Sequence, residues 1–253
     1  MTPIEYVDGF YFKRDDMFEV CGVKGGKSRA AYQLITQAIE QGYKTIVTAG
    51  SRMSPQCEIV SAICNDLSLS CHLFMPQGKD TSVLENIKNN TSAIVHRCKV
   101  GYNSVICYEA NKWASENKAF YVPFGMECVE NIEITKHEVQ NIPKEVKRII
   151  VPCGSGMSMI SVIKGLEYYG MTDKKVVAIQ VGKDPTKNLK KFLGDKNSLF
   201  NTLNYEIKKS QLDYHEKPIQ TTFCGIELDP IYEAKCVPFL RKGDLLWIVG
   251  KRL

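Results

Sequence analysis

The alternation of short apolar, β-branched runs with helical patterns constrains the fold of this chain more than any other feature. Such alternation is typical of βαβ units, in which a helix connects two parallel strands. The predicted strands are 45–49, 71–75, 93–96, 119–122, 148–152, 176–181 and 245–249. The predicted helices are 28–41, 56–67, 82–89, 102–116, 156–169 and 186–193. The sequence therefore predicts an α/β protein with open parallel sheets, and leaves 199–220 unassigned apart from at most one short element.

Composition narrows the class of protein. The chain has 253 residues, of which 44% are hydrophobic and 24% charged, with a net charge of +5. No apolar run is long enough to cross a bilayer, and the N-terminus lacks the basic and apolar parts of a secretory signal, so we expect a cytoplasmic protein without a membrane partner. The basic residues are scattered, which makes nucleic acid an unlikely partner without excluding it, and an anionic small molecule explains the charge equally well.

The ten cysteines include no CxxC pair and no zinc-ligand spacing. We expect free thiols in a reducing compartment, and no metal site. Cys57, Cys64 and Cys71 recur every seven residues, which we interpret as one apolar helix face rather than a redox or metal motif.

A glycine and serine turn follows the predicted strand 148–152 and precedes a helix. Its backbone N–H groups, the helix N-terminus and the serine hydroxyls could together bind a phosphate. The residues of this turn are Gly154, Ser155, Gly156, Met157 and Ser158. A purely structural tight turn remains the alternative for Gly-Ser-Gly alone. A dinucleotide-binding enzyme fits less well, because Met159 stands where the third glycine of that fingerprint is expected.

Several motifs occur in a fixed order, and together the chain resembles fold-type II pyridoxal phosphate enzymes. The branch it resembles contains 1-aminocyclopropane-1-carboxylate deaminase and D-cysteine desulfhydrase. The matching motifs span nearly the whole chain: Lys-Arg-Asp-Asp at 13–16, Gly-Gly-Lys-Ser-Arg at 25–29, the turn at 50–54, Gly-Ser-Gly at 154–156 and Leu-Asp-Pro-Ile-Tyr-Glu-Ala-Lys at 228–235. The resemblance implies pyridoxal 5'-phosphate as cofactor, bound in the cleft between two open parallel-sheet α/β domains. It places the large domain at 1–44 and 121–253 and the small domain at 45–120, and it implies a homodimer.

The resemblance also implies roles for cofactor-binding residues. Lys27 would form the Schiff base, which requires a deprotonated amine. The turn at 154–158 would hold the phosphate. Glu233 would face the pyridine nitrogen and keep it protonated, which favours an α-carbanion or quinonoid intermediate.

Around the substrate, the resemblance is less complete. Ser54 would lie near the substrate carboxylate, and Tyr232 and Tyr214 would face the substrate, although the alignment of Tyr214 crosses the least readable region. Pro55 replaces an asparagine that binds the cofactor's ring hydroxyl in the family, a contact that Gln56 or Asn103 could supply. We therefore expect retained cofactor binding with an altered substrate.

The function predicted from the sequence is a pyridoxal phosphate enzyme of lyase, deaminase or decarboxylase type that acts on an amino acid or amino-acid-like group. The alternative is a catalytically silent homologue that binds pyridoxal phosphate or an anion. A variant of the first reading is an enzyme that acts on an amino-acid adduct of a nucleotide or a modified DNA base.

Overall fold

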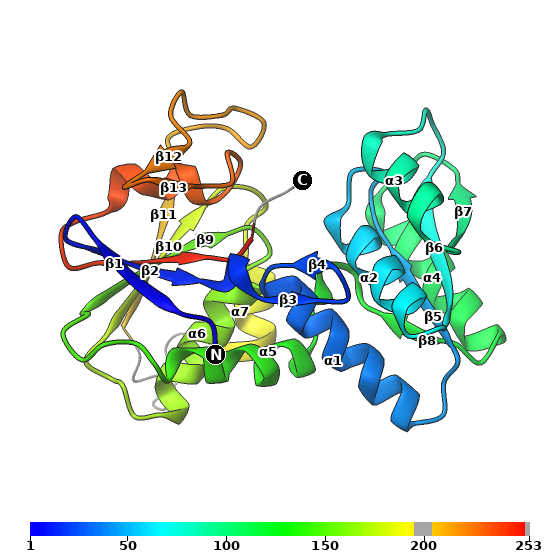
Figure 1. Ribbon diagram of the computed structural model, residues 1–253, viewed down its shortest axis with the longest axis horizontal. Helices are drawn as coiled ribbons and strands as arrows, with labels where there is room; N and C mark the ends of the chain where they lie inside the picture. The colour runs from blue at the N-terminus through cyan, green and yellow to red at the C-terminus, as the bar shows by residue number, and fades with distance from the viewer. Residues whose placement is uncertain (195–203, 251–253) are drawn as a thin grey trace. The chain divides into compact units, whose positions relative to one another are not determined.

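The computed structural model describes residues 1–194 and 204–250, which divide into two compact units (Figure 1). Unit 1 comprises Met1–Phe18 and Val129–Leu253, and unit 2 comprises Glu19–Cys128. These boundaries differ from the expected 45 and 120, since helix α1 (Gly26–Glu40), which carries Lys27, belongs to unit 2. The physical reason is packing: Leu34 and Ile35 of α1 are buried in the same core as helix α2 (Pro55–Asp66).

Unit 1 contains a six-stranded sheet in the order β1-β2-β14-β9-β10-β11. The strands are β1 Ile4–Val7, β2 Phe10–Arg14, β9 Arg148–Cys153, β10 Lys175–Gln180, β11 Tyr205–Lys209 and β14 Leu245–Ile248. Only β1 is antiparallel to its neighbour in this sheet. The carboxyl ends of the other five strands therefore share one edge, as the predicted parallel fold requires, although β1 and β2 were not predicted.

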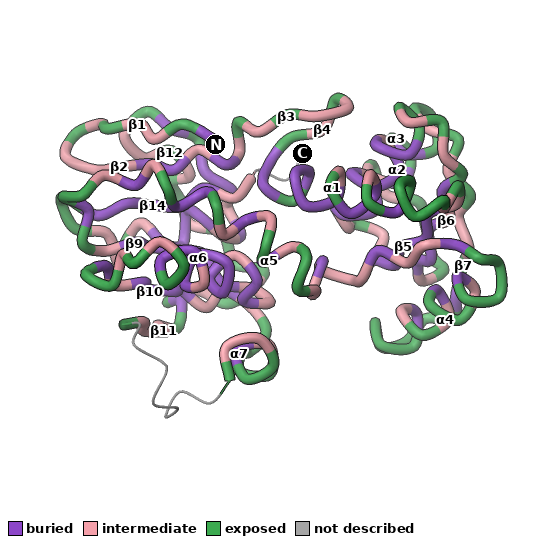
Figure 2. The backbone as a smooth tube through the Cα atoms, turned by 90° about the horizontal axis from the view of Figure 1, so that it is seen from below, coloured by how far each residue is buried: buried purple, intermediate pink, exposed green. Residues whose placement is uncertain are grey.

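The remaining elements of unit 1 are α5 Val129–Thr135, α6 Met157–Tyr168, α7 Thr186–Leu193, β12 Thr222–Phe223, β13 Ile226–Glu227 and the 3-10 helices η1 Asp15–Met17, η3 Lys136–Val139 and η4 Glu233–Phe239. Figure 2 shows α6 mostly in the colour of buried residues and α7 mainly in the colours of exposed and intermediate residues. Gly165 permits close packing of α6 against η3, because a Cβ atom there would lie 2.3 Å from the carbonyl oxygen of Lys136.

Unit 2 contains a four-stranded parallel sheet in the order β7-β6-β5-β8. Its elements are β3 Glu19–Val20, β4 Val23–Lys24, β5 Thr45–Ala49, β6 Ser70–Pro76, α3 Ser82–Asn90, β7 Ile94–Cys98, α4 Asn103–Glu116, β8 Phe120–Val122 and the 3-10 helix η2 Phe124–Met126, besides α1 and α2. Successive side chains of a strand point to opposite faces of the sheet, so neighbouring residues of β5 belong to different cores. Ile46 packs with α1, α2 and α3, whereas Val47 packs with α4. Helices thus cover both faces of this sheet.

The predicted helix face of three cysteines is wrong in part. Cys57 and Cys64 lie on α2, but Cys71 lies on β6, because α2 ends at Asp66. All three are buried in one core, so their packing role does not depend on a shared helix. Among the helices of the described residues, none combines the length and the apolar character needed to span a membrane.

Candidate functional site

The glycine and serine turn lies at the carboxyl end of β9. Gly156 is the N-cap of α6 and has a φ of 90°, a conformation that glycine adopts without strain. The first N–H groups of α6 have no acceptor within the helix and carry its positive dipole end, so the turn is suited to an anion. Asn188 of α7 donates a hydrogen bond of 2.9 Å to the carbonyl oxygen of Ser155 and fixes the turn. Sequence reasoning missed Asn188, because only the folded chain brings α7 to the turn.

Close packing explains the glycine at the start of this turn. A Cβ atom at Gly154 would lie 3.2 Å from the ring of Tyr232. A side chain at Gly156 would likewise lie 3.0 Å from Pro185. Tyr232 and Pro185 therefore pack directly against the two glycines of the turn.

Glu233 begins η4 as a fully buried carboxylate. Its Oε1 atom accepts a hydrogen bond of 2.9 Å from the N–H of Val249. Its Oε2 atom has no hydrogen-bond partner among the described residues. Burial, and to a lesser degree the charge of Asp229, raise the pKa of Glu233 to about 8 against the opposing effect of the N–H groups of Val249 and Gly250. Such a carboxylate is suited to a positively charged or N–H donor group.

Asp229 holds the start of η4 in place. Its Oδ1 atom accepts hydrogen bonds from the N–H groups of Ile231, at 2.8 Å, and Tyr232, at 3.0 Å. Its carbonyl oxygen accepts a third, from the N–H of Ala234. This role of Asp229 was not predicted. The Asp229-Pro230 pair indicated it, since Asp before Pro is typical of such turns.

Tyr214 and Tyr232 lie beside this turn in unit 1. Their hydroxyl oxygens are 3.4 Å apart, and their rings are 6.2 Å apart in an edge-to-face arrangement. Tyr214 lies against Gly182, where a Cβ atom would come within 3.2 Å of its ring. The structure thus brings together both tyrosines and Gly154, although Tyr214 lies in the segment that was hardest to align.

Lys27 is the second residue of α1 in unit 2, with an exposed side chain. Gly25, the N-cap, has a φ of 97°, and the Ser28 hydroxyl donates a 2.8 Å hydrogen bond to the carbonyl oxygen of Lys24. The backbone of Lys27 thus lies in the first turn of α1.

Ser54 is the N-cap of α2, at the carboxyl edge of the unit 2 sheet. A Cβ atom at Gly50 would lie only 2.6 Å from the Ser54 hydroxyl oxygen, so the hydroxyl lies directly over this glycine. Gln56 donates from its Nε2 atom to Thr48 Oγ1 and to the carbonyl oxygen of Pro123, each at 2.8 Å. Both amide protons are thus used, and Gln56 has none left to replace the asparagine absent at Pro55.

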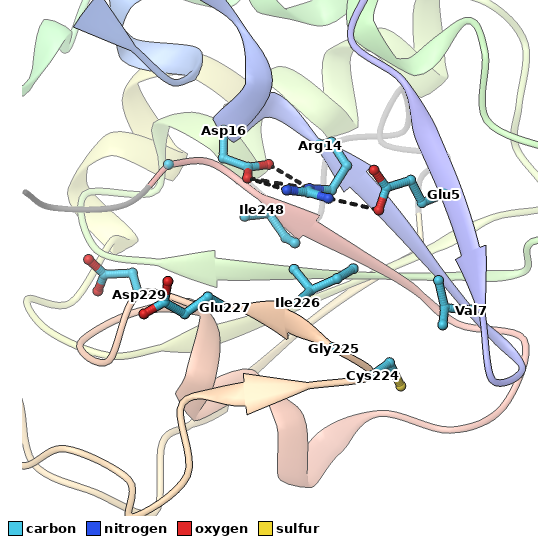
Figure 3. Close-up of a pocket in the computed structure, with 11 residues that line it drawn as sticks. Glu5, Val7, Arg14, Asp16, Cys224, Gly225, Ile226, Glu227, Asp229 and Ile248 are labelled. Atoms are coloured by element: carbon cyan, nitrogen blue, oxygen red, sulfur yellow. Dashed lines mark hydrogen bonds and ion pairs between the residues drawn. The ribbon is translucent and has the colours of Figure 1, made fainter.

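One cavity of about 480 Å³ opens beside β2 and β14 in unit 1 (Figure 3). None of the predicted site residues lines it; the lining residues are Glu5, Val7, Arg14, Asp16, Cys224, Gly225, Ile226, Glu227, Asp229, Ile248 and Gly250. Arg14 bridges Glu5 at 2.7 Å and Asp16 at 2.8 Å. Carboxylates outnumber this single arginine, so the cavity is a poor phosphate site, and the turn at 154–158 is the better one.

Comparison with known proteins identifies related chains. A family model described as "Pyridoxal-phosphate dependent enzyme" matches residues 2–210. A bifunctional D-cysteine desulfhydrase/1-aminocyclopropane-1-carboxylate deaminase from Arabidopsis thaliana is 27% identical over 89% of this chain. An O-seryl-dTMP PLP-dependent decarboxylase from Salmonella phage ViI is 25% identical over 72% of it. The chain spans 65% and 50% of the lengths of these two relatives.

The solved structure of an ACC deaminase homologue matches the whole chain with a TM-score of 0.81 at 20% sequence identity, over 89% of that structure. At this identity the match establishes the fold, a two-part α/β arrangement with parallel sheets.

Proposed function

Because the chain belongs to the family of pyridoxal-phosphate dependent enzymes, we propose that it acts at the α-carbon of an amino acid or amino-acid-like group, as a lyase, deaminase or decarboxylase. Its cofactor is pyridoxal 5'-phosphate. The observation that supports this proposal best is Glu233, a buried carboxylate whose Oε2 atom has no partner among the described residues.

The residues of unit 1 fit this cofactor at two points. The turn at 154–158 offers a helix N-terminus for a phosphate. Glu233 offers an unpaired carboxylate oxygen for a protonated ring nitrogen. Bound pyridoxal phosphate supplies an electron sink for the negative charge that forms at the substrate α-carbon. A protein that merely held an anion would gain nothing from a buried carboxylate, which costs free energy unless it is paired.

The remaining residues would handle the substrate and its protons. Lys27 would attach the cofactor covalently and, once released, could take or return a proton at the α-carbon. The Ser54 hydroxyl would donate to the substrate carboxylate. Tyr214 and Tyr232, with hydroxyl oxygens 3.4 Å apart, could share a proton and deliver it to the departing or reacting group.

Covalent mapping of the cofactor tests the proposal. We expect borohydride reduction of the wild-type protein with pyridoxal phosphate to leave a modified peptide at Lys27, and Lys27→Ala to abolish it. Lys24→Ala is the matched control, because Lys24 is also exposed, lies three residues earlier and pairs with Glu19 at 3.1 Å. A modified lysine elsewhere, or none in the wild type, would contradict the proposal. Turnover of an amino-acid panel then separates an enzyme from a silent binder.

A second candidate is decarboxylation of an amino acid attached to a nucleotide, the type of substrate in the name of the phage relative. One feature of unit 2 favours it: the carboxyl edge of its sheet, where Ser54 lies, carries Arg52, Lys79, Lys99 and Tyr102. No carboxylate among the described residues forms an ion pair with these three cations, and Tyr102 is 84% exposed. Arg52 donates at 2.6 Å to the carbonyl oxygen of Lys79, which joins two of the loops. Cations suit a phosphate, and an exposed aromatic ring suits a base.

Direct comparison of substrates tests this candidate. We expect the cofactor-loaded protein to release carbon dioxide from O-seryl-dTMP faster than from free serine. Tyr102→Ala should raise KM for the nucleotide adduct and leave KM for serine unchanged. Equal or faster turnover of free serine would remove the nucleotide from the proposal.

A further inference from the structure

Lys235 is a buried lysine that the proposed roles do not use. It lies in η4, two residues after Glu233, and is 2% exposed. Its Nζ atom donates to the carbonyl oxygens of Asp213, at 2.6 Å, and Tyr214, at 3.0 Å. Burial lowers the pKa of Lys235, and neighbouring acidic groups, with Glu216 the largest contributor, oppose that effect. The buried amine is therefore directed at the backbone of one segment.

That segment has little regular structure of its own. Residues 210–220 form no helix or strand. Local contacts shape one turn: the N–H of Asp213 donates to Glu216 Oε2 at 2.7 Å, and the N–H of Glu216 donates to the carbonyl oxygen of Asp213. Those bonds fix the turn internally, whereas the two bonds from Lys235 connect it to η4.

We propose that Lys235 is a positioning residue, which sets the Tyr214 hydroxyl against Tyr232 by holding the Tyr214 backbone to η4. Tyr232 is the N-cap of the same 3-10 helix, so one element carries Tyr232 directly and Tyr214 through Lys235. The hydroxyl oxygens of these two tyrosines, 3.4 Å apart, and the Lys235 contacts all lie within unit 1. The consequence for catalysis rests on the proposed function; the positioning itself does not.

Lys174 provides a matched control. It is 3% exposed, burial lowers its pKa, and its Nζ atom donates to backbone carbonyls of Pro143, Lys144 and Val146. It thus resembles Lys235 in burial and bonding, but its partners lie in another loop. Lys174→Met should cost stability as Lys235→Met does, without moving either tyrosine.

Fluorine NMR of the full chain labelled with 3-fluorotyrosine tests the positioning without cofactor. Tyr214→Phe and Tyr232→Phe assign the two signals. We expect Lys235→Met to shift or broaden the Tyr214 and Tyr232 signals, and Lys174→Met to leave both in place. Lys235→Leu also removes both hydrogen bonds to the segment and provides the same test if the methionine variant fails to fold. An unchanged Tyr214 signal in a folded Lys235 variant would overturn the proposal.

Kinetics of the cofactor-loaded protein then test the consequence. Misplacement of a reacting group by about 1 Å can cost on the order of a hundredfold in rate. We expect Lys235→Met to lower kcat by roughly ten- to a hundredfold, with little change in KM and with the cofactor still attached to Lys27. If the wild type attaches no cofactor, the proposed function fails, while the NMR result still decides the role of Lys235.

Discussion

Replacement of Glu233 by glutamine should remove part of the pH dependence of the free energy of unfolding. The pKa of Glu233 is about 8 in the folded chain, against 4.5 for an ordinary glutamate. A difference of about 3.5 corresponds to about 5 kcal/mol, because each pKa step is worth about 1.36 kcal/mol. The pKa is raised in the folded state, so ionisation opposes folding. The cost is absent below about pH 4.5, grows as the pH rises and is complete above about pH 8.

Glutamine has the same shape and no charge, so Glu233→Gln removes this cost. Without cofactor, we expect the variant to gain stability relative to the wild type from pH 4.5 upward, by about 5 kcal/mol above pH 8. Urea unfolding followed by tryptophan fluorescence, to which the fully buried Trp247 of unit 1 contributes, measures the difference. With pyridoxal phosphate, the difference in the free energy of unfolding between the two proteins should become smaller, because a protonated ring nitrogen would pair with Glu233 only in the wild type.

Glu138→Gln is the control of opposite sign. Glu138 is also buried in unit 1, but its Oε2 atom lies 2.7 Å from Nζ of the fully buried Lys13. Loss of one partner from a buried pair costs about 3–5 kcal/mol, so this variant should be destabilised at neutral pH. Identical pH profiles for the wild type and Glu233→Gln would refute the reasoning, since they would mean that Glu233 does not titrate differently on folding.

Two further predictions concern the scaffold. Gly165→Ala should cost about 1–3 kcal/mol in urea unfolding, because its Cβ atom would meet a backbone carbonyl of η3 at 2.3 Å; Gly101→Ala, where the nearest atom is 4.0 Å away, should be nearly neutral. His96→Phe should reduce the loss of stability that unit 2 shows as the pH falls. Burial lowers the pKa of His96, so the wild type loses stability as the pH falls below about 6.5, and stability measured from about pH 7 to pH 5 should fall less in the variant. An equal fall in both proteins would contradict the second prediction.

The parallel strands β5, β9, β10 and β14 were predictable because they are buried along nearly their whole length, which leaves continuous apolar runs in the sequence. Strand β2 was missed for the opposite reason. It contains Lys13, which reads as a surface residue but is fully buried and paired with Glu138, far away in the chain. A tertiary ion pair of this kind leaves no local signal in the sequence.

The candidate site shows the same division. Backbone chemistry made the turn at 154–158 recognisable, since two glycines between a strand and a helix N-terminus are typical of anion-binding turns. Side chains that depend on distant partners were not predictable. In the sequence, Lys235 resembles a solvated helix lysine, but its Nζ atom donates to a distant carbonyl. Gln56 resembles a free donor, but it donates to Thr48 and Pro123. Cofactor binding follows from the sequence motifs, whereas the tuning of the site depends on these tertiary contacts.

One short element organises most of the site in unit 1. The carboxylate of Asp229 fixes the start of η4 through two N–H groups. From that start, Tyr232 lies over Gly154, Glu233 reaches Val249 and Lys235 holds the Tyr214 segment. Tyr232, Glu233 and Lys235 lie within four consecutive positions, so a short 3-10 helix is long enough to carry all three side chains. Tyr214 is thus tied to η4 through Lys235, besides the bonds between Asp213 and Glu216 that shape its own turn.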